Sequence, residues 1–180
     1  SPSFSASRFC LVDRGITFAI AHIRGGGDLG DNWHTEGKRK LKKNTFLDYI
    51  ACANHLIEQR YTHKGGLCFY GGSAGGLTGG SVANMAPELF FAMLLLVPFV
   101  DTMTTMLNEK LPLTPAEWEL WGNPIKSKEY FDYILSYSPY NNLGKKKYPP
   151  MLITSSIFDN RVLYSEPVKY IAKLREVKED

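Results

Sequence analysis

Apolar residues along this chain fall into runs and spacings that predict an alternation of strands and helices. Four continuous apolar runs are typical of strands buried in a parallel sheet: 16–23, 67–70, 91–97 and 151–154. Helices are predicted after three of these runs, over 45–59, 74–85 and 164–177. Strands that alternate with helices favour a parallel α/β fold. The proline-containing stretch from Asp101 to Tyr148 is expected to form a helical cap over one end of the sheet.

The second apolar run breaks into a helix through a glycine turn with a serine at its tip, Gly71-Gly72-Ser73-Ala74-Gly75-Gly76. This is the pattern of a nucleophile elbow, in which the serine sits on a strained backbone and side chains at Gly71 or Gly75 would collide with their neighbours. The amide of Ala74 would point to the oxyanion that forms when Ser73 attacks a carbonyl. The pattern therefore predicts a serine nucleophile, and a glycine turn with an idle serine is the structural alternative.

A serine nucleophile needs an acid and a base, which follow it in that order in α/β-hydrolases. Asp101 and Asp159 each come after a predicted strand, at the sheet edge where open α/β folds place function, although either could simply cap a loop. The four histidines all precede Ser73: His22, His34, His55 and His63. The chain thus contains an elbow and candidate acids without a base in the expected place.

A second glycine cluster, Gly25 to Gly30, competes with the elbow because it satisfies the dinucleotide-binding fingerprint after a predicted strand. A dinucleotide site needs a helix of small apolar residues directly afterwards, whereas Asp31-Asn32-Trp33-His34 follows here. Neither cluster continues into Gly-Lys-Ser/Thr, so a nucleotide phosphate loop is not supported either.

The predicted cap contains two carboxylates whose sequence contexts differ. Thr114 followed by Pro115 indicates a helix start, and Glu117 three residues after Thr114 completes a capping box. Glu119 has no such structural explanation. A carboxylate in a cap over the site could also receive a cationic substrate side chain, so both interpretations of Glu117 stay open.

The composition is that of one ordinary globular domain. Of its 180 residues 44% are apolar and 22% charged, and the net charge of +3 results from 21 basic and 18 acidic residues. Basic runs at 38–40, 42–43 and 145–147 are typical of solvated faces, so we expect no nucleic-acid partner.

The cysteines and the apolar runs indicate the cellular compartment of the protein. Cys10, Cys52 and Cys68 form an odd set without paired spacing, which favours a reducing compartment. We find neither a charged-then-apolar leader nor an apolar run as long as a membrane span. The expectation is a cytoplasmic protein without a membrane partner.

Short blocks spread over nearly the whole chain follow one another in a recognisable order. They are Ala21–Gly27, Gly71–Gly76, Val82–Asn84, Ala86–Phe90, Val97–Asp101, Pro112–Thr114, Glu117–Trp118, Trp121–Pro124, Tyr137–Tyr140 and Ala172–Glu176. In this order they resemble the prolyl oligopeptidase family of serine peptidases, and most closely its oligopeptidase B branch. The resemblance implies an α/β-hydrolase fold with a mainly parallel central sheet flanked by helices, incomplete at both ends.

The resemblance also implies the catalytic roles. Ser73 matches the nucleophile, Asp159 the acid of the triad, and Ala74 the residue whose amide lines the oxyanion hole, while Asp101 becomes the second choice of acid. The substrates would be short peptides. This mechanism requires no metal and no cofactor.

The resemblance also implies a substrate specificity. In the oligopeptidase B branch the glutamates that match Glu117 and Glu119 select Arg or Lys before the cleaved bond. Arg161 matches a position where family members hold a substrate carbonyl. Trp118 and Trp121 keep a post-proline-cleaving oligopeptidase as the alternative, although a proline pocket should be apolar rather than acidic.

Some parts of the family pattern fall outside these residues. The family's histidine lies further along than Asp180, its oxyanion tyrosine lies before Ser1, and its substrate-screening β-propeller domain is absent. Phe158 also replaces the histidine that the family commonly has beside the acid. We therefore expect residues 1–180 to be a partial catalytic domain, inactive alone. A catalytically inactive fragment, or a non-catalytic relative that acts by binding, remains the alternative from another class.

Overall fold

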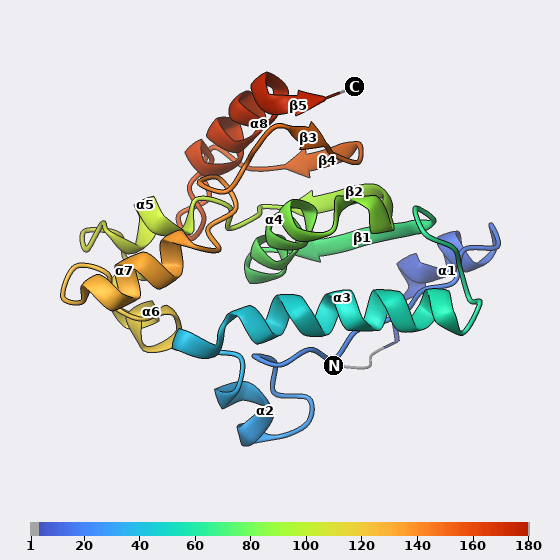
Figure 1. Cartoon of the computed structure of the whole chain (residues 1–180), viewed down its shortest axis with the longest axis horizontal. Coiled ribbons are helices and arrows are strands. Elements are labelled where there is room, and N and C mark those ends of the chain that lie inside the picture. Colours follow the sequence, from blue (N-terminus) through green and yellow to red (C-terminus); the bar gives the residue numbers. More distant parts are fainter. Residues whose placement is uncertain (1–3, 180) are drawn as a thin grey trace.

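The computed structural model describes residues 4–179 as a parallel sheet with helices packed on it (Figure 1). The sheet has three strands in the order β1 (Leu67–Gly72), β2 (Phe90–Leu96) and β4 (Met151–Thr154), and both pairings are parallel. The predicted parallel α/β arrangement is confirmed. These strands also lie within two residues of the bounds expected from their apolar runs.

Three long helices pack on one face of the sheet: α3 (Lys43–Glu58), α4 (Ala74–Met85) and α8 (Ser165–Val177). Figure 1 shows α3 and α4 beside β1 and β2, and α8 near β4 at the other end of the sheet. Phe46 of α3 and Leu77 of α4 are fully buried in the main core, and Tyr170 of α8 anchors a smaller cluster. These three helices are the ones that the sequence predicted.

The opposite face of the sheet is exposed. Tyr70 of β1 is in register with Leu94 of β2, which is in register with Leu152 of β4, so the three side chains point to the same face. Tyr70 is 57% exposed and Leu152 is 62% exposed. Parallel strands are normally buried on both faces, so this sheet presents apolar surface to solvent.

The exposed face predicts how the 180 residues behave by themselves. We expect them to aggregate or to pack loosely, because an apolar sheet face and an open strand edge favour association with other chains. Size-exclusion chromatography and near-ultraviolet circular dichroism measure this. A monodisperse monomer with sharp near-ultraviolet bands and cooperative melting would contradict the prediction.

The strand predicted over 16–23 is wrong. This segment pairs with no strand among the described residues, and only an isolated bridge between Arg24 and Gly26 follows it. Ile16 is 49% and Ile20 is 41% exposed. An apolar run forms a strand only where a neighbouring strand satisfies its backbone, and no described strand lies beside this one.

The stretch between β2 and β4 forms the predicted helical cap. Its helices are α5 (Thr102–Met106), α6 (Thr114–Trp121) and α7 (Lys128–Leu135). They lie beyond the carboxyl ends of the strands, at the left of Figure 1. The cap thus covers the sheet edge to which the elbow also belongs.

The capping box predicted at the start of α6 is wrong. The helix begins at Thr114 itself, and no side chain caps its N-terminus. Thr114 Oγ1 donates instead to the carbonyl of Thr105 at 3.0 Å, and Glu117 Oε2 accepts from Trp121 Nε1 at 2.8 Å. Because the hydroxyl is used in a contact with α5, Glu117 has no capping role.

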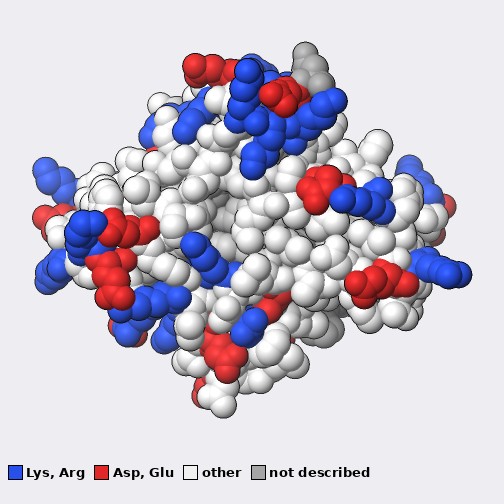
Figure 2. All heavy atoms as spheres, in the orientation of Figure 1, with Lys and Arg blue, Asp and Glu red and all other residues white. Residues whose placement is uncertain are grey.

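Shorter elements complete the described chain: α1 (Ala6–Val12), α2 (Asp31–Thr35), η1 (Arg39–Leu41), η2 (Pro87–Leu89), β3 (Lys146–Lys147) and β5 (Lys178–Glu179). Basic side chains gather over α8, β3 and β5, at the top of the view, with acidic ones among them (Figure 2). The middle of this face is mostly uncharged. Within residues 4–179 no helix combines the length and the apolar character needed to span a bilayer.

Candidate active site

Ser73 stands at the sharp turn between β1 and α4. Its φ of 52° and ψ of −118° are unusual for a residue with a side chain, a strain that costs about 1–3 kcal/mol. Three backbone hydrogen bonds hold this conformation. The Ser73 N–H donates to the carbonyl of Leu96 at 2.9 Å, and the Ser73 carbonyl accepts at 3.1 Å from the N–H groups of Leu77 and Phe99. The side chain is exposed, as an elbow nucleophile must be.

The glycine requirement of the turn is confirmed at one position and wrong at another. A Cβ added to Gly71 would lie 2.8 Å from Phe69 Cε1 and 2.9 Å from the carbonyl oxygen of Gly75. At Gly75 itself nothing lies within 4 Å of an added Cβ. Gly71 therefore permits the close approach of strand and helix, whereas Gly75 is in open space.

A second strained residue, Val97, lies beside the elbow. Its φ is 41°, an outlier for a β-branched residue. Its N–H donates to the carbonyl of Thr154 at 2.9 Å, and it follows Leu96, whose carbonyl holds Ser73. Strain of this kind clusters at functional sites. The sequence did not predict it, because the proline that follows favours an extended backbone at Val97.

A cavity of about 220 Å³ lies against Ser73. Residues of the elbow, of the cap and of the loop before α8 line it, including Ser73, Ala74, Thr105, Glu117, Trp121 and Arg161. Ala74 is the first residue of α4, and the first N–H groups of a helix have no acceptor within it. The structure thus brings four predicted site residues to one cavity: Ser73, Ala74, Glu117 and Arg161. Sequence reasoning missed Thr105 as a lining residue.

Glu117 and Glu119 lie in different surroundings although both belong to α6. Glu117 lines the cavity, and its Oε1 has no hydrogen-bond donor among the described residues. Glu119 is absent from the cavity lining, and its side chain is 67% exposed. Its carboxylate pairs with Arg39 at 2.5 Å, and Lys38 lies at 3.9 Å. Of these two glutamates, Glu117 is the one that presents a free carboxylate oxygen on the cavity side.

Asp159 lies in the loop that also supplies Arg161 to the cavity, although its own side chain is not part of the lining. Its Oδ1 accepts from the N–H groups of Arg161 at 2.8 Å and Val162 at 3.0 Å. These bonds, that of Val162 first, lower the pKa of Asp159. The carboxyl is therefore held ionised, and Oδ2 has no hydrogen-bond partner among residues 4–179.

Asp101, the second-choice acid, belongs to a buried cluster between α5 and α8. It is 1% exposed, and its Oδ2 forms an ion pair with Lys169. Its N–H donates to Glu166 Oε2 at 2.9 Å, and Thr105 Oγ1 donates to Glu166 Oε1 at 2.5 Å. Burial raises the pKa of Glu166 to about 7, against the lowering effect of the Thr105 bond. Asp101 is therefore held by structural contacts inside the fold.

The buried Glu166 carboxyl predicts a defined pH dependence of stability. Its pKa rises from 4.5 to about 7 on folding, so the folded state binds its proton more tightly. This contribution to the free energy of unfolding is full below about pH 4.5, falls as the pH rises, and is lost above about pH 7. The variant Glu166→Gln cannot ionise and should lack this fall. Thermal melts of both proteins at about pH 5 and pH 8 test it, and identical pH dependence would refute it.

The basic runs at 38–40 and 42–43 form the predicted solvated face only in part: the Arg39 and Lys40 side chains are exposed, whereas Lys42 is not. Lys42 is buried, with its ammonium 5.0 Å from the centre of the Trp121 ring, and burial lowers its pKa to about 8. Arg39 Nε donates to the carbonyl of Glu119 at 2.9 Å, and the Lys43 N–H donates to the hydroxyl of Tyr133 at 3.0 Å. The run therefore fastens the cap helices α6 and α7 to the start of α3.

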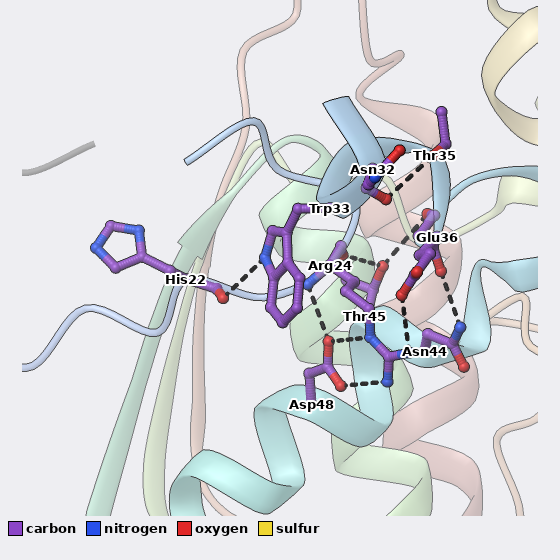
Figure 3. A network of polar contacts seen from close by, with 10 residues as sticks. His22, Arg24, Asn32, Trp33, Thr35, Glu36, Asn44, Thr45 and Asp48 are labelled. Carbon is purple, nitrogen blue, oxygen red and sulfur yellow. Dashed lines mark hydrogen bonds and ion pairs between the residues drawn. The ribbon is translucent and has the colours of Figure 1, made fainter. Parts of the chain in front are cut away.

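The glycine-rich loop at 25–30 is fixed by an arginine network that sequence reasoning missed (Figure 3). Arg24 Nε and Nη2 donate to the two oxygens of Asp48 at 2.8 and 2.6 Å, which lowers the pKa of Asp48. The Arg24 carbonyl accepts from Thr45 Oγ1 at 2.7 Å, and Trp33 Nε1 donates to the carbonyl of His22 at 3.1 Å. The following helix, α2, has only five residues. The loop thus packs on α3 and lacks the long helix of a dinucleotide site.

Comparisons with known proteins agree with this arrangement. The profile of the prolyl oligopeptidase family matches residues 2–180. "Protease 2" of Moraxella lacunata is 51% identical over 99% of the chain and 26% of its own length. "Dipeptidyl aminopeptidase BI" of Pseudoxanthomonas mexicana is 49% identical over 98% of the chain and 24% of its own length.

Among solved structures, oligopeptidase B from Leishmania major superimposes with a TM-score of 0.96 at 49% identity, covering 99% of this chain and 25% of that one. The chain therefore spans about a quarter of the length of these relatives. The expected α/β-hydrolase fold is confirmed by this match. With a family match over nearly its entire length, the chain belongs to the prolyl oligopeptidase family.

Proposed function

We propose that this chain forms part of the catalytic domain of a serine peptidase that cleaves short peptides, after Arg or Lys. Ser73 is the nucleophile and Asp159 the acid of its triad. The observation that carries the proposal is the strained turn at Ser73, with φ of 52°, beside a cavity that also holds Glu117 and Arg161. Membership of a peptidase family supports the same reaction.

The reaction follows from these groups. A histidine from a segment outside residues 1–180 takes the proton of the Ser73 hydroxyl as its oxygen attacks the scissile carbonyl. The Ala74 N–H, at the start of α4, donates to the oxyanion. The histidine then protonates the leaving amine. Water takes the place of the amine: the histidine removes a proton from it as its oxygen attacks the acyl carbon, and the proton passes to the Ser73 oxygen when the acid product leaves. Asp159, kept ionised by two backbone N–H groups, orients the histidine and stabilises its charged form.

Substrate preference is assigned to the cavity wall. The free Oε1 of Glu117 can accept from a guanidinium or an ammonium group of the substrate. The Arg161 side chain has no hydrogen bond or ion pair among the described residues, so it can donate to a substrate carbonyl. Glu119 acts on the substrate only if its ion pair with Arg39 opens.

A post-proline peptidase is the second candidate, because the cavity also has aromatic walls. Phe99 and Trp121 both line it, with ring centres 5.5 Å apart. Such rings suit a proline side chain. The carboxylate of Glu117 in the same cavity favours the basic preference.

We also propose a domain organisation for the whole protein. Residues 1–180 are a partial catalytic domain of a longer cytoplasmic protein, in which a β-propeller domain screens substrates by size. Without the segment that supplies the histidine, the 180 residues hydrolyse peptides at background rates. Loss of a triad member costs up to about 10⁶ in turnover.

A panel of four short peptides that differ only before the cleaved bond tests the function. The full-length protein should hydrolyse the peptides with Arg and Lys there faster than those with Pro or Ala. Preference for Pro would support the second candidate. Binding of all four peptides without hydrolysis would contradict a peptidase and support a non-catalytic relative.

A further inference from the structure

The link between α8 and the cap joins two walls of the cavity. Glu166 lies in the first turn of α8 and is 3% exposed. Its two carboxylate oxygens accept from Thr105 Oγ1 at 2.5 Å and from the Asp101 N–H at 2.9 Å. Thr105 lines the cavity, and its carbonyl accepts from Thr114 Oγ1, at the start of the helix that carries Glu117. The carboxylate therefore holds one wall through α5.

The other wall is attached to the same residue through the backbone. The Glu166 N–H donates at 3.0 Å to the carbonyl of Leu163, which ends the loop that carries Asp159 and Arg161. Val162 of this loop is buried in the core. One turn further along α8, Lys169 pairs with Asp101 and fastens the helix to α5 a second time. The loop and the cap thus meet at one buried carboxylate.

We propose that Glu166 is a positioning residue of the peptidase, which fixes the loop of Asp159 and Arg161 relative to the cap wall that carries Glu117. This inference rests on the proposed function. A buried carboxylate is costly unless both of its oxygens are hydrogen-bonded, and here both are. A group that only filled space at this position would not need two hydrogen-bonding atoms. Its position between the walls therefore indicates that it sets their separation.

The test uses the full-length peptidase, with each preparation titrated by a fluorophosphonate so that kcat/KM is expressed per reactive site. Glu166→Ala should lower this value by about 10- to 100-fold, because a displacement of about 1 Å of a catalytic group has effects of that size. Glu166→Gln should stay within about fivefold of wild type, because its amide can bond both partners when the Thr105 hydroxyl rotates. Glu176→Ala changes an exposed glutamate of the same helix and should have no effect.

If Glu166→Ala does not fold, Thr105→Val tests the same contact from α5. This variant removes the donor and keeps the shape of the side chain, and it should lower kcat/KM per site by about 3- to 10-fold. Unchanged kcat/KM per site in both Glu166→Ala and Thr105→Val, with only the yield or the melting temperature reduced, would overturn the inference. A wild-type protein that neither reacts with the probe nor hydrolyses peptides would instead overturn the proposed function.

Discussion

Replacing Ser73 with alanine should lower peptide turnover by the full-length protein by about 10⁶-fold, because it removes the attacking oxygen and with it the use of the triad. The fold should persist. The three backbone bonds that hold the turn do not involve the side chain, and alanine at a φ of 52° is no more strained than serine. The measurement is kcat on a short peptide with Arg before the cleaved bond.

Ser136→Ala is the matched control for this variant. Ser136 is exposed at the end of α7, and its hydroxyl bonds only the nearby carbonyl of Tyr133 at 2.6 Å. Its turnover should equal that of wild type. Full activity in Ser73→Ala would exclude Ser73 as the nucleophile.

Glu117→Gln should reduce kcat/KM much more for a peptide with Arg before the cleaved bond than for one with an uncharged residue there. A charge-assisted hydrogen bond contributes roughly 1.5–3 kcal/mol, which corresponds to about 10- to 150-fold. Glutamine can still accept from Trp121 Nε1 and should preserve the local structure. The measurement is the ratio of kcat/KM for the two peptides.

Glu119→Gln is the matched control, because Glu119 lies two residues away on α6, outside the cavity, and pairs with Arg39. An exposed ion pair contributes little, about 0–1 kcal/mol, so the ratio should barely change. Equal losses on both peptides in Glu117→Gln, with a lower melting temperature, would show that Glu117 serves the structure through Trp121. A larger change in Glu119→Gln would mean that its ion pair opens when substrate binds.

The elements that local pattern alone determines could be predicted from the sequence. The helix at 74–85 has its expected bounds, because a glycine turn and a strained serine mark its start. The strand at 151–154 is introduced by two prolines and is also as expected. In these segments turn chemistry and burial favour the same structure.

The predictions that were wrong concern segments whose structure depends on contacts with residues distant in the sequence. The apolar run at 16–23 has the pattern of a strand, but a strand needs a neighbour that the run itself does not specify. Thr114 has the sequence of a helix cap, yet its hydroxyl bonds the carbonyl of Thr105. Lys42 belongs to a basic run, and only the packing of Trp121 reveals that it is buried.

In the candidate site, too, some features follow from local pattern and others depend on distant contacts. The elbow at Ser73 follows from local pattern, and the structure has the strained backbone that this pattern requires. The difference between Glu117 and Glu119 depends on where α6 rests, which the run at 38–43 determines through Arg39 and Lys42. No spacing in the sequence could reveal those contacts.

Locating a fluorophosphonate adduct would show whether Ser73 is the reactive nucleophile. The full-length protein would be labelled, digested and mapped by mass spectrometry. We expect a single adduct, on the peptide that contains Ser73, and none in Ser73→Ala. An adduct on another serine, or unchanged labelling of Ser73→Ala, would contradict this assignment.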